Sequence, residues 1–205
     1  MRPVIIVALL ATTAHADDSD PLHVDTGLIG TYVSSNGRGG FGAVFEPKLL
    51  IDDHVAVGGR LEAAVMFGGA IGSAGDTQMD VGALGALLAK GEYLFGDAEV
   101  RPFVGLGVGV FDIASQSIAT TQSTASIDQK AGRYFGVAPQ LGIDLGRVRI
   151  AVTYDAILGA DIEVHQTVGG TTQSTSYSQS YLGGELSFRF GGDVRPAARA
   201  TVAGR

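Results

Sequence analysis

Side chains that could act as acids, bases or metal ligands are few and scattered in this sequence. Cysteine is absent from the 205 residues, so no disulfide, thiolate ligand or cysteine nucleophile is available. Beyond residue 20 the histidines are His23, His54 and His165. Glu163 lies two residues before His165, and this pair could bind a metal or assist a base, but a solvated loop explains it more simply. We therefore predict no catalytic residue, no cofactor and no metal site.

Alternating glycines at Gly105, Gly107 and Gly109 have the spacing of a nucleotide-binding loop. No helical pattern follows them and they interrupt an extended pattern, so we exclude nucleotide binding here. Glycines within a strand instead leave space for large neighbours and allow the strand to curve. Charged residues make up only 17% of the chain, with a net charge of −7 and no basic cluster, so we expect no nucleic-acid partner.

Apolar residues alternate with polar or small ones along most of the chain after residue 20, which is the period of a β-strand. In 54–68, Val55 and Phe67 share one face, while Arg60 and Glu62 share the other. A tilted strand needs about 10 residues to cross a bilayer. The segments with this pattern and length are 22–33, 41–51, 54–68, 81–95, 100–110, 134–145, 148–158 and 181–190.

The connectors between these segments alternate in length. The short ones are 52–53, 96–98 and 146–147, and the long ones lie near 34–40, 69–80, 112–132 and 159–180. Outer-membrane barrels join their strands by short periplasmic turns and longer outer loops, so both termini are expected in the periplasm.

The last long connector has the pattern of a hairpin. Residues 161–168 and 171–178 flank Gly169-Gly170, which is a two-residue turn signal. We expect this 161–178 hairpin to continue the last two strands beyond the membrane as a protruding sheet. Its exposed edge could pair with a strand of another surface protein.

One face of the alternating segments combines small residues with charges of both signs in near balance. A closed interior requires this balance because an unpaired buried charge costs several kcal/mol. The narrow interior of an eight-stranded barrel also requires small residues beside long charged ones. We therefore predict that this face lines the interior and that the apolar face meets lipid. The predicted interior charge network is Asp25, Glu46, Lys48, Arg60, Glu62, Lys90, Glu92, Arg101, Asp144, Arg149, Asp155, Glu185 and Arg189.

Aromatic residues of the apolar face gather near the ends of the segments, as they do at the two interfaces of a membrane. We expect an outer girdle of Tyr32, Phe41, Phe67 and Phe135. We expect an inner girdle of Tyr93, Phe95, Phe188 and Phe190. The opposite orientation of the two faces would give a soluble, lipocalin-like periplasmic barrel that binds an apolar ligand, which remains an alternative.

The N-terminus has the three regions of a signal peptide in order. Arg2 is followed by the apolar run Val4–Ala11, and Ala14 and Ala16 fit the small-x-small rule for cleavage before Asp17. The C-terminal residues are rich in Ala, Gly and Arg, a composition expected to be disordered. The predicted organisation is a signal peptide at 1–16, a barrel at 17–190 and a periplasmic tail at 191–205.

Two segments resemble the small OmpA/OmpX-like outer-membrane β-barrels of the outer membrane protein β-barrel domain group. Residues 101–110, Arg-Pro-Phe-Val-Gly-Leu-Gly-Val-Gly-Val, are similar to a strand common in that group. Residues 183–190 are similar to its closing strand, whose last aromatic residue is read by the barrel-assembly machinery. The resemblance covers 22–190. Family barrels often end on that aromatic residue, whereas this chain continues to residue 205.

The resemblance implies an all-β, eight-stranded antiparallel up-and-down transmembrane barrel whose partners are outer-membrane lipid and the barrel-assembly machinery. We expect a non-enzymatic structural or surface-interaction role through the outer loops. A lipid A-modifying enzyme is one alternative, although the His-Ser pair of the family's deacylases is absent and no spacing singles out a set around His165 and Asp161. A narrow ion channel is another, although side chains fill an eight-stranded interior.

Overall fold

A computed structural model gives the fold of residues 22–35, 37–51, 53–71, 77–96, 100–120, 125–168 and 171–191. The predicted signal peptide, its cleavage site between Ala16 and Asp17, and residues 192–205 of the predicted tail lie outside the described residues. Within the described ranges, no helix is long and apolar enough to cross a membrane.

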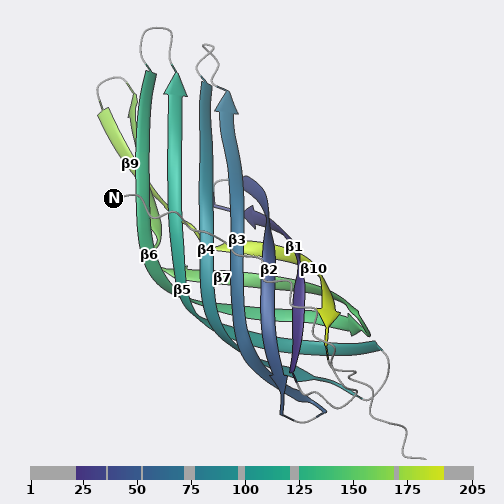
Figure 1. The fold of residues 1–205 in the computed structure, drawn as a ribbon. Coiled ribbons are helices and arrows are strands. Elements are labelled where there is room, and N and C mark those ends of the chain that lie inside the picture. The colour runs from purple at the N-terminus through teal and green to yellow at the C-terminus, as the bar shows by residue number, and fades with distance from the viewer. Residues whose placement is uncertain are drawn as a thin grey trace, which may run out of the picture.

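Eight antiparallel strands close into a barrel, in the order β1-β10-β7-β6-β5-β4-β3-β2 (Figure 1). Strands β8 and β9 pair with each other in a separate two-stranded sheet. This closed all-β barrel confirms the predicted fold class. The strands are β1 (Leu22–Val33), β2 (Arg38–Leu50), β3 (Val55–Ile71), β4 (Thr77–Leu94), β5 (Val100–Thr120), β6 (Ala125–Leu145), β7 (Val148–Leu158), β8 (Asp161–Val168), β9 (Thr171–Ser178) and β10 (Tyr181–Phe190).

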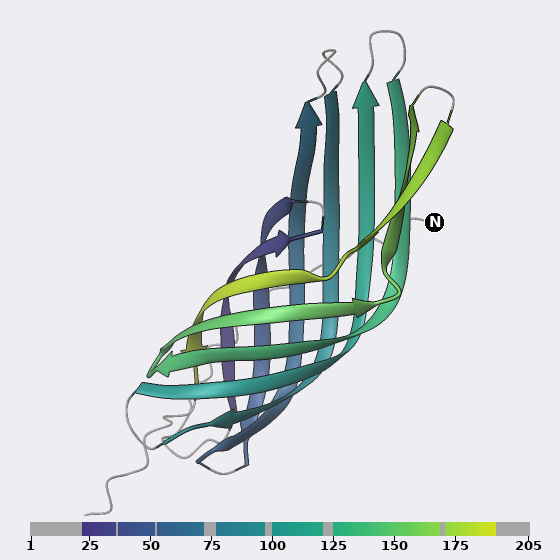
Figure 2. The same cartoon turned by 180° about the vertical axis from the view of Figure 1, so that it is seen from behind.

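The prediction of a long loop is wrong for two segments. The segments 69–80 and 112–132 were expected to be connectors, but strand structure runs through most of both. The β5–β6 ladder continues without a break from Val100 opposite Leu145 to Thr120 opposite Ala125. Backbone pairing therefore extends beyond the region where one face has to be apolar. As a result, β3, β4, β5 and β6 rise as a tall wall on one side of the barrel (Figure 2).

The 161–178 hairpin forms with the predicted strand bounds, but it does not continue the barrel wall. Its base is tied by a backbone hydrogen bond from the Gln179 amide to the Ala160 carbonyl (2.9 Å). The Ile157 amide donates to the Ser180 hydroxyl at 3.1 Å. Between these contacts Gly159 has φ +72°, a left-handed conformation that glycine adopts without strain. The chain therefore bends at this point, and the hairpin leaves the barrel.

The short connectors lie at the opposite end of the barrel. Gly96 and Gly146 have φ values of +75° and +70° there. Only glycine adopts such angles readily, so these residues allow the tight turns that precede β5 and β7. Along β10 every second side chain from Tyr181 onward is buried and every other one is exposed. This strict alternation separates an inner from an outer surface.

Two clusters of buried apolar residues fill parts of the lumen. The larger one, toward the end with the tall wall, contains Val33, Met66, Leu84, Ala86, Leu88, Phe111, Ala138, Ile157, Ala160 and Tyr181. The smaller one, toward the short turns, contains Ala56, Leu94, Phe103 and Ala151. Along β3 and β4, charged residues lie between the two clusters in sequence. The lumen is therefore a packed, layered core.

Candidate functional site: the interior charges and the outer sheet

The structure buries every charged residue that was predicted to line the interior. Their exposed fractions range from zero for Asp25 to 8% for Arg189. They come from all eight barrel strands, because the alternation of each strand directs its charged positions inward. A cluster this dry has to be paired internally, since each isolated charge would be strongly disfavoured.

Arg60 lies at the centre of the part of the network nearer the tall wall. Its guanidinium contacts Glu46 on β2 at 2.5 Å, Glu185 on β10 at 2.7 Å and Glu62 on its own strand at 2.8 Å. The Tyr181 hydroxyl donates to Glu62 at 2.6 Å. One arginine on β3 is thus bound to carboxylates on three strands.

Asp25 is the centre of the part nearer the short turns. Its carboxylate contacts Lys48 at 2.8 Å, Arg189 at 2.9 Å and Arg149 at 3.1 Å. Glu92 has a similar role, with Arg149 at 2.7 Å and Lys48 at 2.9 Å. The two halves of the network are joined because Lys90 contacts both Glu46 at 2.6 Å and Glu92 at 2.8 Å.

Small residues make room for these side chains, and Gly142 is a clear case. The Arg149 guanidinium lies 3.5 Å from the centre of the Phe103 ring, in a cation–π contact. A Cβ atom on Gly142 would lie 2.6 Å from an atom of that ring and closer still to the Ile150 carbonyl oxygen, and both separations are shorter than van der Waals contact allows. Glycine is therefore required where Phe103 packs beneath Arg149.

Among the residues that the structure describes, two members of the predicted network, Arg101 and Asp155, form no ion pair. Arg101 donates instead to the backbone carbonyl of Asp53, near a short turn. Both carboxylate oxygens of Asp155 are buried and make no hydrogen bond with the residues that the structure describes. The remaining eleven predicted residues form ion pairs with one another.

Sequence reasoning missed neutral members of the network. The Gln140 side-chain amide donates to the Thr153 hydroxyl at 3.0 Å and to Glu185 at 3.1 Å. Tyr181 supplies the hydroxyl bound to Glu62. The signal was available in the alternation, since Tyr181 shares its parity with Glu185 on the same strand.

The residues of the two predicted aromatic girdles are exposed on the outside of the barrel. Phe41 and Phe67 lie 6.1 Å apart between ring centres, and Gly39 is paired with both Tyr32 and Phe67. At the other end of the barrel, Tyr93 and Phe95 lie 5.0 Å apart. Each set therefore contains aromatic neighbours at its own end of the barrel.

The tall wall carries polar features beyond Phe135. Arg133 on β6 contacts Asp112 on β5 at 2.7 Å, and both side chains are exposed. Hydrogen bonding to Arg133 holds the pKa of Asp112 below its ordinary value. The register of the separate hairpin places His165 opposite Ser174 and Glu163 opposite Ser176 on the neighbouring strand.

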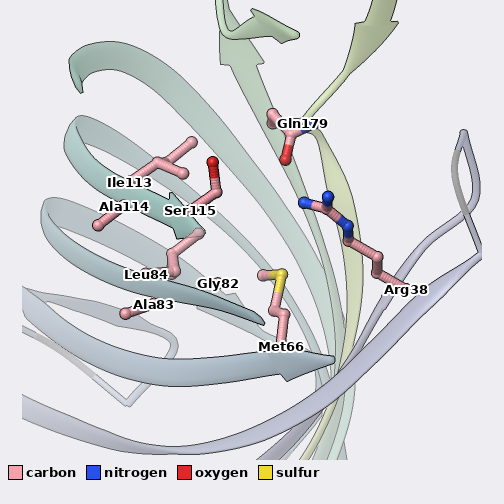
Figure 3. Close-up of a pocket in the computed structure, with 9 residues that line it drawn as sticks. All are labelled: Arg38, Met66, Gly82, Ala83, Leu84, Ile113, Ala114, Ser115 and Gln179. Carbon is pink, nitrogen blue, oxygen red and sulfur yellow. The ribbon is translucent and has the colours of Figure 1, made fainter. Parts of the chain in front are cut away.

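A small recess lies inside the barrel mouth, at the foot of the tall wall (Figure 3). Arg38 and Gln179 point toward it from one side, and it is lined by Met66, Leu84 and Ile113. Arg38 is paired with Asp80 at 3.0 Å, so its charge is matched there. No group of three or more His, Cys, Asp and Glu residues suited to a metal ion occurs in the part of the chain that the structure describes.

A scan against protein-family models and a search of curated proteins each find no match for this chain. Solved structures with a similar fold include the N-terminal β-barrel domain of OprF from Pseudomonas aeruginosa, at 13% identity and a TM-score of 0.38 over 82% of this chain and 97% of that chain. Another is Ail, the attachment invasion locus protein of Yersinia pestis, at 10% identity and a TM-score of 0.43 over 83% of this chain and 99% of that chain.

A third is Neisserial surface protein A, at 15% identity and a TM-score of 0.33 over 82% of this chain and 92% of that chain. The closed eight-stranded barrel of this chain is established by its own strand order. It is also the fold that the OmpA/OmpX-like resemblance of the sequence implied.

Proposed function

We propose that this chain is a non-enzymatic barrel of the outer membrane that takes part in surface interactions through the elements at the end bearing the tall wall. The observation that carries the membrane placement is the distribution of side chains. Charged residues fill the interior, while large apolar residues such as Leu28, Leu106 and Leu141 are more than half exposed around the outside. A surface this apolar is suited to lipid rather than to water.

A soluble barrel of the lipocalin type would have the reverse arrangement, with charges outside and an apolar cavity inside. The described lumen is instead occupied by ion pairs and by the two apolar clusters. The same packing argues against a channel, because the charged side chains are buried and the larger cluster lies between them and the wall end of the barrel.

Membrane placement is tested by fractionation of cells that produce the full chain. We expect the protein in the outer-membrane fraction, soluble only with detergent, and migrating faster on a gel before boiling than after it. Recovery of the protein from the periplasm without detergent would show that the outside of the barrel faces water and would refute the proposal.

The surface role is supported by the free backbone at the wall end of the barrel. Strands β8 and β9 pair only with each other among the described residues, which leaves an outer edge on each. An open edge is a template for a strand of another protein, because its amides and carbonyls can complete a ladder. We expect a surface protein with an extended segment as partner.

This role is tested by replacing residues 161–178 with a short turn and comparing cells that display either form. Barrel assembly should be unchanged, because the hairpin is a separate sheet. Adhesion of the cells to an immobilised surface protein that has an extended segment should fall severalfold. Equal adhesion by both forms, at equal surface amounts, would exclude the hairpin as the interacting element.

A further inference from the structure

The upper part of β6 has an open edge within this chain. Strand β6 begins at Ala125, yet its pairing with β7 begins only at Phe135, opposite Leu158. On the side away from β5, no strand of the described ranges pairs with residues 125–134. On that side, the tall wall therefore carries a row of backbone amides and carbonyls with no ladder partner among the described residues. The strand that follows β7 along the chain is β8.

The register and the strand lengths match this edge to β8. In the β6–β7 ladder, each step up β7 is matched by one step back along β6, from Leu145 opposite Val148 to Phe135 opposite Leu158. If β8 continued the same register, its first residue Asp161 would lie opposite Gly132. Its last residue Val168 would then lie opposite Ala125, the first residue of β6. In this register, β8 and the unpaired edge of β6 therefore end at the same level.

A local irregularity explains why this ladder is not made in the structure. Asp155 pairs with Tyr181, and the next backbone contact joins Ala160 to Gln179. Residues 156–159 on one side therefore face only Ser180 on the other. Such a bulge bends a strand and increases its twist, and here it includes Gly159 with φ +72°. The bend turns the hairpin away from β6.

We propose that the barrel has a second conformation, in which Gly159 becomes extended and β8 adds to the open edge of β6 in the register of the β6–β7 ladder. The occupant of the edge is β8 of the same chain, with β9 still paired on its far side. The wall then becomes one continuous sheet from β3 to β9, and the β6 edge is covered. An external strand could use that edge only by displacing β8.

The chain contains no cysteine, so engineered pairs report this contact without background. In the proposed register Ser126 lies opposite Thr167, and directly paired strand residues have the Cα separation that a disulfide needs. We expect S126C/T167C to form an intramolecular disulfide when the assembled barrel is oxidised in its membrane. The matched control is S126C/T172C, because Thr172 pairs with Thr167 on β9 and would lie one strand farther away. It should form at least tenfold less disulfide.

A hinge variant gives a second measurement. A valine at position 159 strongly disfavours a positive φ, so Gly159→Val should favour the extended form. We expect it to raise the rate of disulfide formation in S126C/T167C by about tenfold. Barrel assembly, followed by gel mobility without boiling, should be unchanged in all variants because the substituted residues lie outside the closed ladder.

Three outcomes would overturn the inference: no disulfide in S126C/T167C, equal disulfide in the control, or covalent dimers in place of monomers. Dimers would assign the edge to a second copy of the chain. The inference concerns contacts within one chain and stands apart from the proposed surface role. Loss of hairpin-dependent adhesion and formation of this disulfide are measured separately, so either can fail alone.

Discussion

Replacing Arg60 by alanine tests directly whether the charged face of the strands lines the interior of the barrel. The guanidinium is 1% exposed and lies within 2.8 Å of carboxylate oxygens of Glu46, Glu62 and Glu185. Its removal leaves Glu46 with Lys48 and Lys90, each at 2.6 Å, but leaves Glu62 and Glu185 without an ion pair among the described residues. Breaking a buried pair by removing one partner costs about 3–5 kcal/mol, and we expect R60A to lose stability in that range.

The assay is urea unfolding of the barrel in lipid vesicles, followed by gel mobility without boiling. At a slope of about 2 kcal/mol per molar urea, the expected loss lowers the midpoint by about 2 M. Arg60→Lys keeps one charge without the forked geometry and should fall between R60A and the parent. If R60A does not assemble, the lysine variant still gives the comparison.

The matched control is Arg133→Ala. Arg133 also contacts a carboxylate, Asp112, at 2.7 Å, but it is exposed on the outside of the wall, where water screens the pair. We expect no measurable shift in its midpoint. A loss below about 0.5 kcal/mol in R60A would place Arg60 in water and refute the assignment of the charged face to the interior.

Further predictions concern the packing of the lumen, ion conduction through the barrel and enzymatic modification of lipid A. Gly142→Ala should destabilise the barrel by about 1–3 kcal/mol in the same unfolding assay, because its Cβ would press on the Phe103 ring, whereas Gly184→Ala has no atom within 4 Å and should be neutral. In planar bilayers the protein should show no stable stepwise current, and a steady open state would argue against the packed lumen. Lipid A can be compared by mass analysis in three kinds of cell: with the parent protein, with the His165→Ala variant and without the protein. All three should contain identical acyl groups. An acyl group found only with the parent protein would establish an enzyme.

Alternation in the sequence was sufficient to predict the part of each strand that closes the barrel, because one face there packs inside and the other is exposed outside. β1, β7 and β10 occupy the predicted segments 22–33, 148–158 and 181–190. The upper halves of β5 and β6 escaped prediction, since neither face of a segment such as 115–120 is consistently apolar, with Ile118 and Ala119 among polar residues. In water neither face needs apolar residues, so only the backbone ladder specifies the strand, and it leaves no hydrophobic period.

The larger apolar cluster in the lumen was not predicted from the sequence, for the opposite reason. Leu88 follows Leu87 and Phe111 follows Val110, so both faces of the strand are apolar at these positions. A run without contrast does not tell which side is inside, and the charges elsewhere suggested a wholly polar interior. The structure buries Leu88 and Phe111 and exposes Leu87. The interior is therefore layered, with apolar clusters on both sides of the charged residues along β3 and β4.

The packing of the described lumen favours the outer end of the barrel as the place for a specific activity. Buried charges paired on several sides are poorly suited to bind a passing solute, because opening them would expose unpaired charges. The outer end differs, since β1 ends at Val33 and β2 begins at Arg38, while β5 continues to Thr120. β7 also ends at Leu158, so among the described residues the β6 edge above Phe135 has no neighbouring barrel strand. Recognition at that edge can change with the position of the hairpin, while the charge network below keeps the barrel itself unchanged.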